Sequence, residues 1–301
     1  MSLLVTGSIG IDSVTSPFGK AENVLGGSAV YFAFAAAQYV PVRLVGAVGD
    51  DFPPRFRGML ESRNIDLSGL EVRSGSKTFR WTGRYEGALA EAETVEVHLN
   101  VLSERAPVVP EKFADSRFVF LANTHPTLQR ELLAQITSPR LSVCDTMNLW
   151  IEIERDSLVE TLTRVTGVIL NDGEARQLTG RTNLIEAAEF VLDLGPKFVM
   201  VKKGEHGALL VSADGPAAIP AYPSKLVRDP TGAGDSFAGG VLGYLASQDE
   251  LNGPALKRAM VHGTVAASFA IEDFSLGRVQ KLPREEIDDR VDEMVRMLRF
   301  D

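Results

Sequence analysis

The chain has 301 residues, 45% of them hydrophobic, and a formal net charge of −9. This length and apolar content suit one large α/β domain, and the acidic excess argues against a nucleic-acid partner. The single cysteine, Cys144, excludes a disulfide framework. No apolar run of membrane-spanning length is free of charge, and no basic segment precedes an apolar run at the start. We therefore expect no membrane partner, no signal peptide and a cytoplasmic location.

Short apolar runs alternate with amphipathic segments along the chain. Strands are predicted at 3–7, 43–48, 117–121, 141–145, 167–170, 197–201 and 208–211. Helices are predicted around 27–39, 53–63, 128–137, 156–164, 173–179, 184–194, 234–247, 254–271 and 284–299. This alternation predicts a parallel sheet with helices on both faces. Because the sequence has no repeat or long linker, we expect a single domain over residues 1–301.

Residues 76–101 break this alternation, because they read as consecutive strands without helices between them. Such strands predict a small antiparallel sheet that stands apart from the main one. An ordinary hairpin insertion is the alternative, and the residues alone do not choose between the two.

Polar side chains follow several of the predicted strands. They are Asp12, Asn123, Asp145, Asn171, Glu174, Lys202 and Lys203. In open α/β sheets, ligands bind beyond the carboxyl ends of the strands. Each polar residue alone is unremarkable in a loop, but together they predict a single rim that binds a ligand.

The most informative segment is Asp229–Gly240, which reads Asp-Pro-Thr-Gly-Ala-Gly-Asp-Ser-Phe-Ala-Gly-Gly. Its Gly232-Ala233-Gly234 turn directly precedes an apolar run with helical spacing. The first amides of a helix have no partner within the helix, and the helix dipole is positive there. Glycines let an anion approach those amides. Asp235 is also a good capping residue, but a cap alone does not require the glycines. The segment therefore predicts a site for a phosphate group.

Two common nucleotide motifs do not fit. The Walker pattern requires Gly-Lys-Ser/Thr after a glycine-rich loop, and Gly19-Lys20 is followed by Ala21. The dinucleotide pattern Gly-x-Gly-x-x-Gly begins at Gly232 but fails at Phe237, and it lies far from the first strand. A dinucleotide-dependent oxidoreductase is therefore disfavoured.

The segment Asp229-x-Thr231-Gly232-Ala233-Gly234-Asp235-x-Phe237 resembles the C-terminal signature of the ribokinase-like carbohydrate kinases of the PfkB type. The resemblance implies a three-layer α/β/α fold with a mostly parallel sheet and a small β lid. It also implies that the amides of Gly232, Ala233 and Gly234 form an anion hole for the transferred phosphoryl group. Asp235 would be the catalytic base for the acceptor hydroxyl. Fixed amide dipoles suit a transition state whose charge is spread over phosphoryl oxygens.

The same resemblance assigns the nucleotide and metal residues. Asn171-Asp-Gly-Glu174 is similar to the family's Asn-x-x-Glu motif, which organises Mg²⁺ and the ATP phosphates. A helix cap with a surface glutamate is the alternative. The segment Lys203-Gly204-Glu-His-Gly207 resembles the family's nucleotide loop, and a hairpin turn there is compatible with that role.

Three further expectations follow from the resemblance. Thr231 is expected to contact the nucleotide, and Asp229 matches a position linked to a monovalent-cation site, such as one for K⁺. The segment 76–101 is expected to provide most of a lid over the acceptor pocket, and such lids often also form a homodimer surface.

Near the N-terminus, Gly26-Gly27 opens a helix and resembles the family signature that meets the sugar, and Asp12 matches the hydroxyl-binding aspartate. Asn123 and Asp145 are further candidates for the acceptor pocket. The sequence departs from the family at Tyr31, where members commonly carry asparagine. This tyrosine either packs against a ring of the acceptor or fills core, so the departure puts the identity of the acceptor in doubt.

The sequence therefore predicts a kinase that transfers the γ-phosphate of ATP to an alcohol of a small polyhydroxylated substrate, with a sugar favoured. A nucleoside kinase of the same fold, of the adenosine kinase kind, is the nearest alternative. A protein that binds metabolites without catalysis is the alternative from another class, and the presence of Asp235 with an intact Gly-Ala-Gly turn argues against it.

Overall fold

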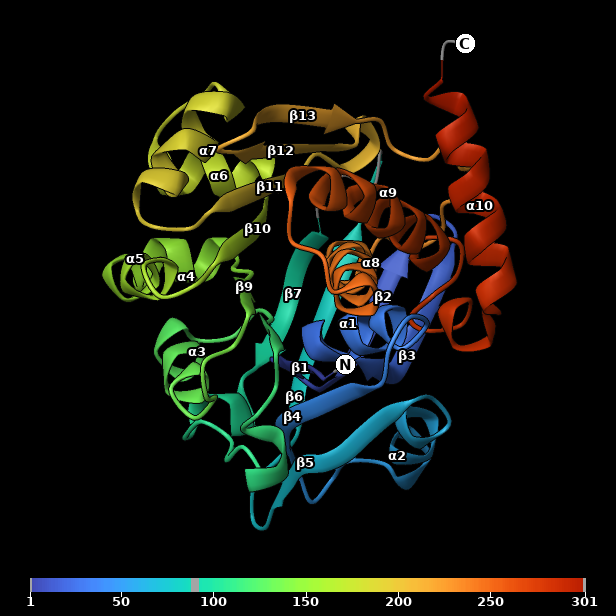
Figure 1. Cartoon of the computed structure of the whole chain (residues 1–301). Helices are drawn as coiled ribbons and strands as arrows, with labels where there is room; N and C mark the ends of the chain where they lie inside the picture. Colours follow the sequence, from blue (N-terminus) through green and yellow to red (C-terminus); the bar gives the residue numbers. More distant parts are fainter. Residues whose placement is uncertain (1, 88–91, 300–301) are drawn as a thin grey trace.

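A nine-stranded sheet forms the middle layer of the computed structural model, which describes residues 2–87 and 92–299 (Figure 1). Its strand order is β13-β12-β11-β10-β9-β8-β1-β4-β5. The bounds are β1 Leu3–Thr6, β4 Val42–Gly49, β5 Ile65–Arg73, β8 Phe118–Leu121, β9 Leu141–Cys144, β10 Gly167–Asn171, β11 Phe198–Lys202, β12 Ala208–Ser212 and β13 Gly215–Ile219. All neighbours pair in parallel except β12 with β11 and β13 with β12. The carboxyl ends of eight strands, all except that of β12, therefore meet at one edge.

Helices cover both faces of this sheet, as expected from the alternating sequence. One face buries the apolar sides of α1 Ser28–Ala36, α2 Pro54–Glu61, α8 Ala233–Gln248, α9 Gly253–Ala270 and α10 Arg284–Met297. The other face buries α3 Pro126–Leu133, α4 Asn148–Ile153, α5 Arg155–Leu162, α6 Asp172–Thr179 and α7 Leu184–Asp193. Figure 1 shows α8 lying between α1 and α9. Within residues 2–87 and 92–299, none of the helices combines the length and the apolarity that crossing a bilayer requires.

Helix α8 is held close to its neighbours by glycines. A Cβ atom on Gly239 would lie 2.5 Å from the carbonyl oxygen of Phe32 in α1, and one on Gly240 would lie 2.6 Å from that of His262 in α9. Larger residues at these positions would push the helices apart. The glycines therefore fix where the first turn of α8 lies relative to the sheet.

A second, four-stranded sheet stands apart from the main one, with the order β3-β2-β6-β7. Its strands are β2 Gly10–Ser16, β3 Gly19–Gly26, β6 Phe79–Tyr85 and β7 Ala92–His98. A β lid was expected mainly from 76–101, but half of its strands come from 10–26. Residues 88–91 of the predicted segment lie outside the described residues. Asp12, which we expected in a loop after the first strand, is instead part of lid strand β2.

The predicted helices and strands of the main layers are all present, with small shifts at their ends. The elements that the sequence did not predict are β5, β13 and α4, besides the two lid strands. Both β5 and β13 are edge strands of the main sheet. Edge strands are partly solvated, so their sequences lack the continuous apolar run of a buried parallel strand.

Candidate active site

The first turn of α8 has backbone amides that are free to bind an anion. Gly232 adopts a left-handed conformation with φ 75°, and the turn that follows makes the Ala233 amide donate to the Pro230 carbonyl at 3.1 Å. Within the described ranges, no acceptor is found for the amides of Gly232, Gly234 and Asp235. Residues 231–235 are partly exposed. The amides available at this helix start are thus those of residues 232, 234 and 235, and that of Ala233 is engaged.

Tyr31 lies directly beneath this turn. A Cβ atom on Gly232 would lie 2.2 Å from Cγ of the Tyr31 ring, so the ring packs against the glycine backbone. Only 2% of Tyr31 is exposed, and burial raises the pKa of its phenol well above the usual value. Tyr31 is therefore part of the core in this structure, and its contact with an acceptor stays a prediction.

Beside the turn, one ammonium group is paired with one carboxylate and interacts electrostatically with two others. Lys202 Nζ, at the end of β11, donates to Asp145 Oδ2 at 2.9 Å. Burial raises the pKa of Asp235 well above its ordinary value, and Asp145 and Glu174 raise it further while Lys202 opposes them. Burial and Asp145 likewise raise the pKa of Glu174 to about 7. These mutual effects place the four side chains in one electrostatic cluster.

Asn171 and Glu174 form a reciprocal cap at the start of α6. Asn171 Oδ1 accepts from the Glu174 amide at 2.7 Å, and Glu174 Oε2 accepts from the Asn171 amide at 2.7 Å. The expected helix cap is therefore present, but Glu174 is buried, with 6% exposed, rather than on the surface.

The second oxygen of Glu174, Oε1, has no partner among the residues that the structure describes. It is a hard oxygen ligand of the kind that Mg²⁺ prefers. No three acidic, histidine or cysteine side chains form a metal cage in the described part of the chain. This sparse donor set fits an ion that keeps its waters and is bound mainly through substrate phosphates.

The loop after β11 is a hairpin turn, as the sequence allowed. The Lys203 amide donates to the Gly207 carbonyl at 2.8 Å, and β12 returns antiparallel to β11. Gly204 and Gly207 have φ values of 54° and 82°, which residues other than glycine rarely adopt. No atom lies within 4 Å of a Cβ built on Gly204. The turn thus presents open backbone at the rim.

Asp12 lies at the lid side of the site and is only 3% exposed. The absence of a side chain at Gly26 makes room for it, because a Cβ there would lie 1.8 Å from Asp12 Oδ2. Its Oδ1 is buried without a hydrogen-bond partner in the described residues. Burial raises the pKa of Asp12 to about 7, a hydrogen bond from the Gly27 amide counters this, and Asp229 adds to the rise. The carboxylate lacks the partners that an acceptor hydroxyl would supply.

Thr231 connects the α8 turn to the lid. Its hydroxyl donates to the Tyr85 hydroxyl on β6 at 3.2 Å, and its amide donates to Asp229 Oδ1 at 2.9 Å. Asp229 is fully buried and also accepts from the Ser275 amide at 3.2 Å. The hydroxyl of Thr231, expected to contact the nucleotide, thus contacts the lid in this structure.

Asn123 follows β8 at the same edge of the sheet, but its side chain is already engaged. Its Oδ1 accepts from Trp150 Nε1 at 2.9 Å, and its Nδ2 contacts Met147 Sδ at 3.0 Å. These bonds fasten α4 to the end of β8. Its contact with an acceptor stays a prediction.

Two residues near the site, Lys202 and Trp81, were not among the predicted site residues. The sequence placed Lys202 at a strand end, but it was the neighbouring Lys203 that we expected to contact the nucleotide. Lys202 of β11 pairs in parallel register with Asn171 of the neighbouring strand β10. This register places Lys202 at the rim. Trp81 on β6 lies opposite Asp12 on β2, so both belong to the same face of the lid.

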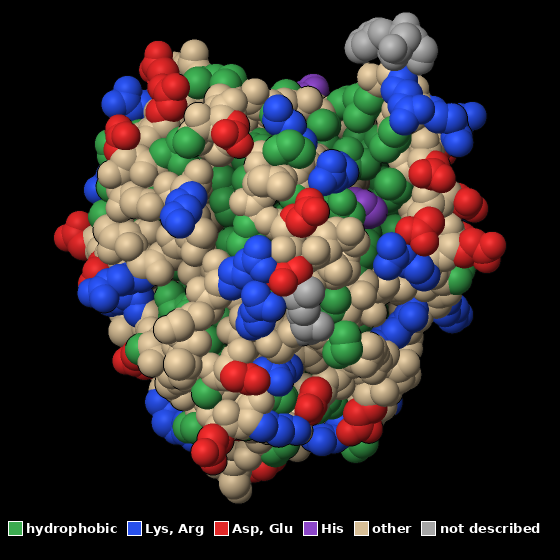
Figure 2. Space-filling view, viewed as in Figure 1, with side chains coloured by type: hydrophobic (Ala, Val, Ile, Leu, Met, Phe, Trp, Pro, Cys, Tyr) green, Lys and Arg blue, Asp and Glu red, His purple; other side chains and the backbone are tan. Residues whose placement is uncertain are grey.

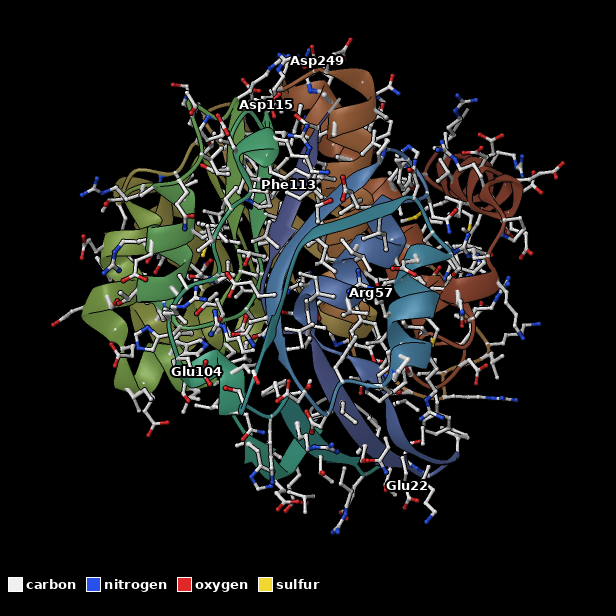
Figure 3. The ribbon with its side chains drawn as sticks, turned by 90° about the horizontal axis from the view of Figure 1, so that it is seen from below. Glu22, Arg57, Glu104, Phe113, Asp115 and Asp249 are labelled. Atoms are coloured by element: carbon white, nitrogen blue, oxygen red, sulfur yellow. The ribbon has the colours of Figure 1, made fainter. Side chains whose placement is uncertain are left out.

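The first turn of α8 lies at the end of the molecule that carries the lid. Asp249, the C-terminal cap of α8, lies near Asp115 at one end in Figure 3, and Glu22 of lid strand β3 lies at the other end. The N-terminus of α8 therefore points toward the lid end. Figure 2 shows acidic and basic side chains interspersed over the face in view.

A three-layer α/β/α arrangement with a β lid is the ribokinase-like fold, a fold of kinases. Residues 9–281 match the model of the pfkB family carbohydrate kinases. The chain belongs to this family.

Known relatives agree with this assignment. The chain is 32% identical to the cytidine kinase of Thermococcus kodakarensis over 253 residues, which are 81% of this chain and 88% of that one. The fold is similar to that of a nucleoside kinase of Methanocaldococcus jannaschii, with TM-score 0.77, 19% identity and coverage of 97% and 98%. It is also similar to a ribokinase II from E. coli in complex with ATP and Mg²⁺, described as putative, with TM-score 0.81, 18% identity and coverage of 97% and 99%.

Proposed function

We propose that this kinase transfers the γ-phosphoryl group of ATP to a sugar hydroxyl of a nucleoside. The observation that carries the proposal is the first turn of α8, where three unengaged amides stand beside Asp235. Asp12 of the lid is close enough to raise the pKa of Asp235. A hydroxyl held by Asp12 would thus lie near both the base and the anion-binding turn.

ATP would lie along the rim formed by Asn171, Glu174, the 203–207 turn and the start of α8. The amides of Gly232, Gly234 and Asp235 would hold the transferred phosphoryl group, because fixed dipoles stabilise charge as it develops. Glu174 Oε1 and Asn171 would help to hold Mg²⁺, which neutralises phosphate charge when bound. The open backbone of Gly204 would pack against the nucleotide, whereas Gly207 packs against the carbonyl of Ile219.

Asp235 would orient the acceptor hydroxyl and accept its proton. Burial and nearby carboxylates raise the pKa of Asp235, and a carboxylate with a raised pKa is a better base. The group must be ionised to act, so activity is expected to rise with pH through this pKa. General-base help of this kind is typically about 10²–10⁴-fold.

The choice of a nucleoside over a free sugar rests on the lid and on the relatives. Trp81 lies on the same lid face as Asp12, and its ring covers Gly83, where a Cβ would lie 2.1 Å from the indole. Trp81 Nε1 donates to Thr94 Oγ1 at 3.1 Å, which fixes the ring on the lid. An aromatic platform beside a hydroxyl-binding carboxylate suits a base attached to a sugar. The similar cytidine kinase favours the same choice.

A panel of acceptors tests this proposal. Purified protein is mixed with MgATP and, separately, cytidine, uridine, adenosine, inosine, ribose and fructose, and ADP release and the ³¹P spectrum of the product are recorded. The proposal predicts a nucleoside monophosphate as the best product. Phosphorylation of free sugars alone would contradict the choice of nucleoside, and ligand binding without transfer to any acceptor would favour a metabolite-binding protein.

A further inference from the structure

Lys202 brings a positive charge into the cluster of three carboxylates beside α8. Its side chain is 16% exposed, and that of its partner Asp145 is 5% exposed. Burial lowers the pKa of Lys202, but Asp145, Glu174 and Asp235 outweigh this effect and the net shift is upward. The ammonium therefore stays charged inside a group of acids that come from β9, α6 and α8.

The ammonium lies against the anion-binding turn. A Cβ atom on Gly234 would lie 2.9 Å from Lys202 Nζ and 3.5 Å from both Cδ and Cε. Gly234 has an ordinary helical backbone, so its φ does not require glycine, unlike that of Gly232. A side chain at position 234 would therefore require the Lys202 side chain to move.

Two groups of hydrogen-bond donors thus face the same volume without acceptors. An ammonium has three N–H donors, and the only acceptor found for it among the described residues is Asp145. The amides of Gly234 and Asp235 are likewise unengaged there. These groups are only partly exposed, and both are available to a ligand. A ligand that satisfies both groups must carry several acceptor oxygens on one centre, as a phosphoryl group does.

We propose that Lys202 is a further catalytic residue, whose ammonium binds the phosphoryl group as it passes from ATP to the acceptor. This inference rests on the proposed function. During transfer, negative charge is spread over three phosphoryl oxygens. The three carboxylates of the cluster would repel that charge, and Lys202 offsets them at the point where the group moves.

A structural role for Lys202 makes different predictions. The ion pair with Asp145 joins the ends of β9 and β11, which flank β10. If that were its purpose, loss of the ammonium would lower stability and leave turnover and nucleotide preference unchanged. The difference between these outcomes can be measured.

The test compares Lys202→Met and Lys202→Arg with Lys197→Met as the matched control, because Lys197 is exposed just before the other end of β11. Three quantities are measured: kcat with the best acceptor, Kd for ADP and for a non-hydrolysable ATP analogue by calorimetry, and Tm. We expect Lys202→Met to lower kcat on the order of 10²–10³-fold, as for loss of one oxyanion donor. Binding of the ATP analogue should weaken, but Kd for ADP should change by less than about 3-fold, because ADP lacks the γ-phosphoryl group.

One rescue variant and one further substitution separate charge from structure. Lys202→Cys removes the ammonium, and alkylation with 2-bromoethylamine restores it at nearly the same position. The natural Cys144 is fully buried, and treated wild-type protein is the control for its modification. Gly234→Ala should displace the ammonium and lower kcat while Tm stays near the wild-type value.

Several results would overturn the proposal: wild-type kcat in Lys202→Met, equal weakening of ADP and of the ATP analogue, or no recovery after alkylation. If the wild-type protein neither binds the ATP analogue nor phosphorylates any acceptor, the proposed function fails and this inference with it. Transfer by the wild type with unchanged transfer by Lys202→Met would overturn the role of Lys202 alone.

Discussion

Asp12 shows how a single residue at this site is kept at a cost to stability. Its carboxylate is almost completely buried, one oxygen has no partner among the described residues, and burial raises its pKa to about 7. A buried carboxylate without full hydrogen bonding is unfavourable unless a ligand completes its shell. The residue is thus better suited to binding than to folding.

This raised pKa links stability to pH with a definite sign. The unfolded carboxyl releases its proton near its ordinary pKa of 3.8, whereas the folded one keeps it up to a pKa of about 7. Folding therefore takes up a proton between these values, and the stabilisation present at low pH is lost as pH rises through the window. Glu174, with its pKa also raised to about 7, acts in the same direction.

Asp12→Asn removes the buried charge and should stabilise the protein without ligand at pH 8. We expect Tm to rise by roughly 2–4 °C for each kcal/mol regained, and the decline in stability between pH 4 and 7 to become shallower. The KM for the acceptor should increase about 10–100-fold, because a charge-assisted hydrogen bond is lost. Thermal melts across pH and steady-state kinetics measure both effects. A lower Tm at pH 8 than the wild type would contradict this account.

At the scale of elements, the start of α8 is determined by two glycines that serve different purposes. Gly232 provides the left-handed turn and leaves room for the Tyr31 ring, whereas Gly234 leaves room for Lys202. The helix continues between α1 and α9, where Gly239 and Gly240 allow close packing. The glycines of this segment therefore determine the packing of α8 against its neighbours as well as the shape of the anion-binding turn.

Gly232→Ala should be strongly destabilising. The left-handed conformation costs roughly 1–2 kcal/mol for a residue with a Cβ, and the new atom would overlap the buried Tyr31 ring. We expect a fall in Tm together with loss of turnover. Gly58→Ala in α2 is the control, since nothing lies within 4 Å of its Cβ position and the helix should gain up to about 1 kcal/mol. Similar melting curves for the two variants would contradict the packing argument.

The lid provides a second test at this scale. Trp81→Ala should raise KM for a nucleoside about 5–100-fold, because stacking of a base on an aromatic ring contributes about 1–3 kcal/mol. ADP affinity should stay unchanged. Phe18→Ala is the matched control, since Phe18 belongs to the same lid but is 61% exposed. An unchanged KM in the Trp81 variant would remove the support that the lid gives to a nucleoside acceptor.

At the scale of the whole molecule, the site gathers residues from distant parts of the chain. Asp12 comes from the lid, Asp145 and Lys202 from strand ends, and Asp235 from a helix near the end of the sequence. A parallel sheet brings these ends to one edge, which is why residues far apart in sequence share one cluster. The lid end and the C-terminal end of α8 lie on opposite sides of the molecule (Figure 3).

The main sheet and the start of α8 could be predicted because short stretches of sequence indicate them directly. The Gly-Ala-Gly turn predicted the start of α8 closely, and apolar runs located the central strands. Strands β2 and β3 were missed because lid strands have a solvated face and a mixed sequence. Their polar residues therefore resemble a loop, and Asp12 was placed in one.

Other features depended on contacts that a sequence does not display. Lys202 and Lys203 are adjacent, and only the position at which β11 ends shows that the first of them joins the acidic cluster. Asn123 was predicted only as a candidate for the acceptor pocket, and the sequence did not indicate its contacts with Trp150 and Met147. Such outcomes are decided by tertiary packing and not by local pattern.

The most direct test of the central claim compares two substitutions at opposite ends of α8. Asp235→Asn removes the proposed base, and Asp249→Asn changes the C-terminal cap, where asparagine tolerates the observed φ of 56°. The measurement is kcat for phosphoryl transfer to the best acceptor, with Tm and ADP affinity as checks on folding. The account predicts a loss of about 10²–10⁴-fold for Asp235→Asn, near-normal turnover for Asp249→Asn, and ADP binding by both. Near-normal turnover in the Asp235 variant would contradict the account.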